Sequence, residues 1–145
     1  MTNIVFLTGR YQLGNDPGVF QDALYVGHDL SLPFTWSWID PDAKSVGLLF
    51  YTHDVETWSD WQGHHVSIND VEVGRLKDPS DKQGVNEVFR IDVPIGVLTA
   101  ALKGKKTFRL TVAVGEQAGS EQFIDDFVLW RIESDGTFAA HLGWK

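Results

Sequence analysis

Apolar and polar residues alternate with a period of two along much of the chain. Successive side chains of a strand point to opposite faces, so each alternating set marks one buried strand face. In the segment 107–114, polar residues occupy the positions between the apolar ones and are expected to face outward. The predicted core is drawn from these sets, above all from Trp36, Trp38, Phe108, Leu110 and Val112. The alternating apolar positions are Leu30, Leu32, Phe34, Trp36, Trp38, Val66, Ile68, Phe89, Ile91, Val93, Phe108, Leu110, Val112 and Val114.

Two further segments, 46–51 and 127–132, are apolar at almost every position, a pattern typical of central strands covered on both faces. Only 95–103 has helical spacing, through Leu98 and Leu102. Short strands separated by turn-forming residues predict an all-β fold, a two-sheet antiparallel β-sandwich. The length of 145 residues fits one domain, 1–145. The turn signals are Asn15–Gly18, Asp40–Asp42, Asn69–Asp70, Asp78–Ser80 and Ser134–Gly136.

The pair Asn69–Asp70 predicts a tight hairpin, because both residue types tolerate the positive φ angles that a two-residue loop requires. Gly74 then interrupts the second arm of this hairpin. A glycine inside a strand indicates a bulge or the close approach of another part of the chain.

Four stretches, 65–74, 89–94, 102–104 and 108–114, resemble the galactose-binding-domain-like sandwiches. They resemble its valine-rich hairpin, its F-x-i-x-v strand, its L-x-x-G-x-N turn and its closing l-x-v-x-v strand, and 125–129 looks like its final strand. The resemblance spans roughly residues 65–132. It implies a jelly-roll fold and favours carbohydrate recognition, although one fold of this kind serves many functions.

The same resemblance implies a structural calcium ion near one end of the sandwich. Its ligands would be the carboxylates Asp125 and Asp126, with Asp16 or Asp22 as further oxygen donors. The alternative is that the acidic pair lies in a solvated loop before a strand. No other cofactor is expected.

The chain carries a net charge of −8 and contains no cysteine, so disulfides and thiolate metal sites are excluded. Its one basic cluster, Lys103, Lys105 and Lys106, flanks Gly104 and is typical of a solvated turn. We therefore expect neither nucleic acid nor a membrane as a partner. No signal peptide or membrane-length apolar run is visible. We expect a soluble protein that stays in the cytoplasm or leaves by a route without an N-terminal signal.

A loop rich in aromatic and polar residues precedes the hairpin. Its candidate ligand-binding residues are Trp58, Asp60, Trp61, Gln62 and His64. Exposed indoles suit stacking on sugar rings, and a few polar groups nearby could orient a ligand. The alternative is that both tryptophans pack into the edge of the core.

The motifs of common enzymes are missing, including a nucleophile elbow, a cysteine nucleophile and a phosphate loop. A pair of carboxylates for glycoside hydrolysis cannot be recognised from spacing along the chain. We predict a protein that is not an enzyme but a lectin-like, carbohydrate-binding module. The alternative is a protein–protein interaction or assembly subunit of a bacterial or phage particle, which the apolar segment 138–145 favours. Self-association into a homo-oligomer is left open.

Overall fold

The computed structural model describes residues 3–57, 63–77, 84–117 and 120–143. Nearly all of its regular structure is β, as the alternation predicts. The single helix of the described residues, α1, spans Ile95–Leu102. The strands are β1 (Ile4–Leu13), β2 (Leu24–Gly27), β3 (Asp29–Ile39), β4 (Ser45–His53), β5 (His64–Ile68), β6 (Val71–Leu76), β7 (Asn86–Pro94), β8 (Thr107–Ala113), β9 (Glu116–Gln117), β10 (Ser120–Ile124), β11 (Phe127–Ser134) and β12 (Phe138–Leu142).

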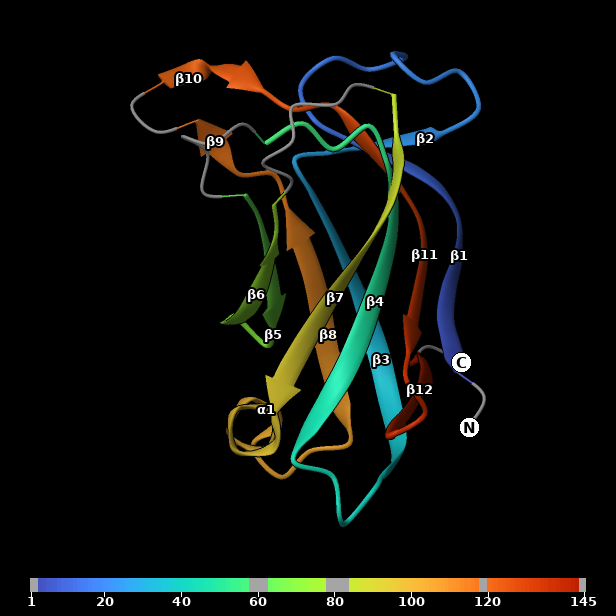
Figure 1. Ribbon diagram of the computed structural model, residues 1–145, viewed down its shortest axis with the longest axis vertical. Coiled ribbons are helices and arrows are strands. Elements are labelled where there is room, and N and C mark those ends of the chain that lie inside the picture. The colour runs from blue at the N-terminus through green and yellow to red at the C-terminus, as the bar shows by residue number, and fades with distance from the viewer. Residues whose placement is uncertain (1–2, 58–62, 78–83, 118–119, 144–145) are drawn as a thin grey trace.

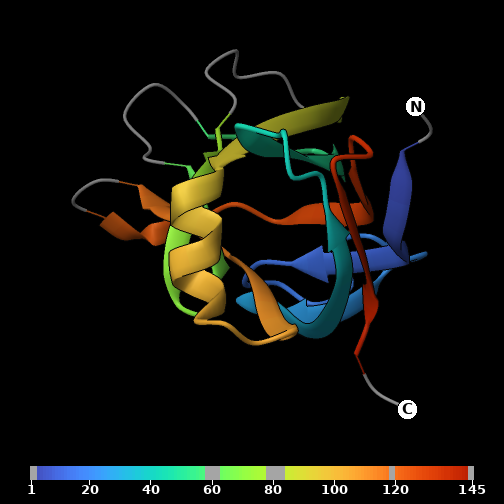
Figure 2. The ribbon, with the colours of Figure 1, turned by 90° about the horizontal axis from the view of Figure 1, so that it is seen from below.

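Two five-stranded sheets face each other (Figures 1 and 2). The first sheet has the order β2-β1-β11-β4-β7 and the second the order β12-β3-β8-β5-β6, while β9 and β10 form a short ribbon of their own. Every pair is antiparallel except β1 with β2. In Figure 1, α1 lies at the bottom of the sandwich and the ribbon lies at the top. The predicted all-β, two-sheet sandwich is confirmed.

Aromatic rings from both sheets meet in the core. Phe34 of β3 stacks on Phe108 of β8, with ring centroids 5.5 Å apart. Phe6 of β1, in the opposite sheet, contacts Phe34 at 5.6 Å and Phe138 of β12 at 5.7 Å. The burial of Phe138 also shows that the part of the apolar C-terminal segment that forms β12 packs on its own sandwich, where β12 pairs with β3.

The core prediction holds for Phe108, Leu110 and Val112, all of which are buried. It is wrong for Trp38, which is 45% exposed, and only partly right for the half-buried Trp36. The cause is an irregularity in the pairing of β3 with β12, which places one extra residue between the two tryptophans. Such a bulge interrupts the strict alternation of faces. In addition, β8 pairs with β3 only as far as Thr35, so Trp38 lies beyond that neighbouring strand.

Segments that are apolar on both faces do form central strands, since β4 and β11 lie side by side inside the first sheet. The hairpin prediction is also confirmed. Asn69 and Asp70 both adopt positive φ angles, 49° and 66°, between β5 and β6. Near Gly74 the register of this pair shifts, and a Cβ on Gly74 would lie 2.7 Å from a methyl carbon of Ile91. The glycine therefore permits both a bulge and close contact with β7 of the other sheet.

The helical spacing of Leu98 and Leu102 corresponds to α1, which buries both leucines. Lys103 ends the helix in the left-handed conformation, and its backbone N–H donates to the carbonyl of Thr99. Within the described residues, no helix combines the length and apolarity that a bilayer span requires.

Candidate functional site

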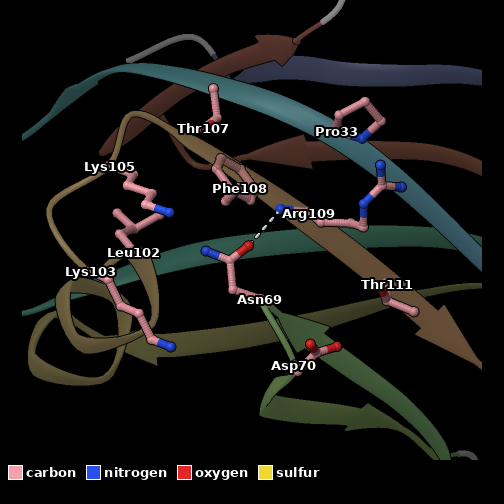
Figure 3. A pocket seen from close by; sticks show the side chains of 10 residues that line it. All are labelled: Pro33, Asn69, Asp70, Leu102, Lys103, Lys105, Thr107, Phe108, Arg109 and Thr111. Carbon is pink, nitrogen blue, oxygen red and sulfur yellow. Dashed lines mark hydrogen bonds between the residues drawn. The ribbon is translucent and has the colours of Figure 1, made fainter.

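An open groove of about 520 Å³ lies on the outer face of the second sheet (Figure 3). Three parts of the fold form it: the outward side of β8 with its neighbour β3, the tip of the β5–β6 hairpin, and the loop that follows α1. Its lining residues are Pro33, Asn69, Asp70, Leu102, Lys103, Lys105, Thr107, Phe108, Arg109 and Thr111.

The alternation of β8 supplies one wall of the groove. Because Phe108 and Leu110 point into the core, Thr107, Arg109 and Thr111 face outward, as the sequence predicts. The Arg109 guanidinium is held at one end, where Nη1 donates to the carbonyl and hydroxyl oxygens of Ser31. These hydrogen bonds hold the positive charge of Arg109 at a defined position on the sheet surface.

Asn69 joins the three parts of the groove. Its side-chain oxygen accepts the backbone N–H of Arg109 at 2.9 Å (dashed in Figure 3), and its side-chain nitrogen donates to the carbonyl of Ala101 in α1 at 2.9 Å. The backbone N–H of Asn69 also donates to the carbonyl of Arg109. These bonds fix the hairpin tip against both the helix and β8.

Positive charge is concentrated at this groove although the protein is acidic. Four of the twelve lysines and arginines fall between residues 103 and 109. Lys103, Lys105 and Arg109 line the groove with a single carboxylate, Asp70. Lys106 lies outside the lining, over the ring of Trp36 at 5.9 Å. Within the described part of the chain, none of the three lining cations forms an ion pair.

The predicted ligand-binding loop is only partly described. Trp58, Asp60, Trp61 and Gln62 lie outside the described residues, and their assignment stays a prediction. His64 is described and is fully buried at the start of β5. Its ring stacks on Phe127 with centroids 4.2 Å apart.

His64 forms a buried hydrogen-bonded pair with Asp125. The backbone N–H of Gly115 donates to His64 Nδ1 at 3.0 Å, so the proton of the neutral ring is on Nε2. Nε2 then donates to Asp125 Oδ2 at 2.7 Å, and the backbone N–H of Glu56 donates to the same oxygen at 2.9 Å. Burial raises the pKa of Asp125, and the hydrogen bonds from His64 and Glu56 oppose that rise. The arrangement links β5 of one sheet to the segment before β11 of the other.

The two candidate calcium ligands are directed to separate partners. Asp126 Oδ1 accepts the backbone N–H groups of Asn15 and Asp16 at 2.9 and 3.1 Å, and so holds the loop after β1. Asp125 is engaged with His64, as described above. Among the described residues, no three His, Cys, Asp or Glu side chains form a group able to hold a metal. Calcium binding at Asp125 and Asp126 stays a prediction.

Sequence reasoning missed Asn69 and Arg109 as residues of one site. A signal for Arg109 was present, because it lies on the polar face of a strand, three residues after the basic turn ends at Lys106. Asn69 becomes part of the groove only because the hairpin tip reaches β8. Asn69 and Arg109 are 40 residues apart in the chain, so no local pattern links them. No family model, curated protein or solved structure matches the chain.

Proposed function

We propose that the protein is a non-catalytic binding module whose groove on the second sheet takes an acidic saccharide. The observation that carries the proposal is the set of three cations, Lys103, Lys105 and Arg109, placed in one groove of an acidic protein. Asn69, Thr107 and Thr111 add short polar side chains between and beside these cations. Cations bind carboxylates or sulfates, and amide and hydroxyl groups bind sugar hydroxyls.

The size of the groove favours a saccharide over a nucleic-acid duplex. A groove of about 520 Å³ holds a small number of sugar rings. A nucleic-acid duplex would cover much more surface than this groove offers.

An assembly role has less support from the surface. Residues Phe138–Leu142 of the apolar C-terminal segment, which favoured that alternative, pair with β3 inside the fold as β12. Of the most exposed large apolar side chains, Leu24 is on β2 and Val88 on β7, at opposite edges of the first sheet. These two side chains, the most exposed of the large apolar ones in the described residues, therefore do not share one patch.

Calorimetric titration with a sulfated oligosaccharide and its desulfated counterpart tests the proposal. We expect saturable binding of the sulfated form, weakened by salt because the contacts are exposed charges. The double variant Lys103→Gln with Arg109→Gln should weaken binding by about tenfold or more, as expected when two charge-assisted contacts are lost. Lys44→Gln, which neutralises an exposed lysine away from the groove, is the matched control. Equal binding of both oligosaccharides, or full binding by the double variant, would refute the proposal.

A further inference from the structure

A second depression lies on the outer face of the first sheet. It has a volume of about 350 Å³ and is lined by Thr8, Gly9, Arg10, Trp130 and Arg131. These residues belong to the adjacent strands β1 and β11, inside the sheet. The opposite sheet carries the groove described above, so the two sites are separate.

Irregular pairing creates the depression. Between β1 and β11, Thr8 pairs with Arg131 and Tyr11 with Leu129, so Gly9 and Arg10 face the single residue Trp130. The pairing of β11 with β4 is also interrupted at Trp130. A bulge redirects a side chain away from the regular alternation. Here two neighbouring irregularities set one tryptophan and one arginine around a hollow.

Gly9, which lines the hollow, is the residue that the local backbone requires. Its φ of 144° lies in a region that side chains rarely adopt. A Cβ at this position would come within 2.9 Å of the Tyr11 ring. Any larger residue would therefore strain the backbone and press against that ring.

The wall opposite β1 is rigid. The ring of Tyr51 in β4 lies 5.1 Å from that of Trp130, and the Arg131 guanidinium lies over the Tyr51 ring at 5.6 Å. Glu133, which is 4% exposed, accepts hydrogen bonds from the Tyr51 hydroxyl at 2.5 Å and from Arg131 Nε at 2.9 Å. A buried carboxylate thus fixes both an aromatic ring and a cation before any ligand arrives.

We propose that this depression binds a single pyranose ring that bears a carboxylate. The C–H face of such a ring packs on the indole of Trp130, and the carboxylate pairs with the guanidinium groups of Arg10 and Arg131. Thr8 supplies a hydroxyl for the sugar. Arg10 is now paired with Asp22 at 2.8 Å, and because both side chains are well exposed, this ion pair is weak enough to exchange for a ligand carboxylate.

The test uses three small probes and the indole N–H resonance of Trp130, assigned with the variant Trp130→Phe. D-glucuronate has both ring and carboxylate, D-glucose has the ring alone, and acetate has the carboxylate alone. We expect a saturable shift of this resonance with glucuronate and a much weaker response to either of the others. Arg10→Gln should weaken glucuronate binding by about three- to tenfold, as expected for one charge-assisted contact.

Two controls keep this result distinct from the groove proposal. Arg90→Gln changes an exposed arginine on β7 of the same sheet and should leave glucuronate binding unchanged. The double variant Lys103→Gln with Arg109→Gln alters only the groove and should also leave it unchanged. The inference is overturned if glucuronate does not move the Trp130 resonance, if acetate moves it equally, or if Arg10→Gln binds as the unmodified protein does.

Discussion

Glu133 is a buried carboxylate that three donors hold in place. Its Oε1 accepts from the Tyr51 hydroxyl and from Asn3 Nδ2, and its Oε2 accepts from Arg131 Nε. Burial alone would raise the pKa of Glu133, but the hydrogen bonds from Tyr51, Asn3 and Arg131 outweigh it and lower this pKa overall. The ionised form is therefore the one that the fold stabilises.

This balance predicts a loss of stability in acid. The pKa of Glu133 is lower in the folded than in the unfolded protein. Its contribution to the free energy of unfolding is therefore complete when the pH is above the unfolded pKa of about 4.3. The contribution is lost as the pH falls through the lower, folded value. Urea titrations across this range should show a shallower decline in the free energy of unfolding for Glu133→Gln. Asp42→Asn, at an exposed turn, is the control, and an unchanged slope in Glu133→Gln would contradict the prediction.

Single residues also show what could be read from the sequence. The sequence was enough to identify three core residues of β8, namely Phe108, Leu110 and Val112. A regular strand alternates its two faces whichever strands it pairs with. Trp38 was misassigned because its exposure depends on a bulge in the pairing with β12. The bond between His64 and Asp125 joins positions 61 residues apart, and no local pattern marks such a contact.

The hairpin of β5 and β6 is an element whose turn chemistry can be tested directly. Asn69→Gly keeps the positive φ but removes the side-chain bonds to Ala101 and Arg109, each worth about 0.5–1.5 kcal/mol. Asn69→Ala loses the same bonds and adds about 1–2 kcal/mol of left-handed backbone strain.

Thermal or urea unfolding of these variants gives the order of effects. Asp70→Gly is the matched control, because Asp70 has a similar φ and its side chain forms no hydrogen bond within the described part of the chain. We expect the free energy of unfolding to fall little in Asp70→Gly, more in Asn69→Gly and most in Asn69→Ala. Equal stability of Asn69→Ala and Asp70→Gly would mean that the turn does not anchor the hairpin.

Elements were easier to predict than their order. The hairpin, the short helix and most strands follow from local periodicity and turn residues. The neighbours of β11 do not, since it lies between β1 and β4, both distant in sequence. The groove depends on the same long-range order, because a hairpin tip, a helix end and β8 meet only after the second sheet has formed.

A substitution of Leu110 tests the placement of the core between the two sheets. It is 2% exposed and pairs with Leu32 of β3 and Ile68 of β5. Leu110→Ala should lower the free energy of unfolding by about 2–5 kcal/mol through lost burial and a residual cavity. Thr107→Ala, on the exposed face of the same strand, should change it by less than about 0.5 kcal/mol. Similar losses in the two variants would refute this placement of the core.

A second connection between the sheets is polar. His64 begins β5 of the second sheet, whereas Asp125 precedes β11 of the first, and Glu56 follows β4 of the first. One oxygen, Asp125 Oδ2, accepts from both His64 Nε2 and the backbone N–H of Glu56. The carboxylate therefore bridges the layers at the end of the sandwich opposite α1.

Substitutions of Asp125 separate its charge from its acceptor role. Asn keeps an oxygen that can accept both bonds and avoids burying a charge, whose cost is the main reason that the pKa of Asp125 is raised. Asp125→Asn should therefore fold with a small change in stability at neutral pH. Asp125→Ala takes the acceptor away from two donors, the His64 ring and the backbone N–H of Glu56, and should cost about 1–3 kcal/mol for each donor left without a partner.

The pH dependence of the same variants completes the test. Because the folded pKa of Asp125 is raised, the folded protein binds this proton more tightly, and the contribution of Asp125 to stability falls as the pH rises above the unfolded value of about 3.9. This dependence is opposite in sign to that of Glu133. Asp125→Asn should remove it, so the variant should gain stability relative to the unmodified protein as the pH rises from 4 through the folded pKa. Urea titrations in that range measure the difference. If Asp125→Asn is as unstable as Asp125→Ala at neutral pH, the negative charge itself holds the two sheets together.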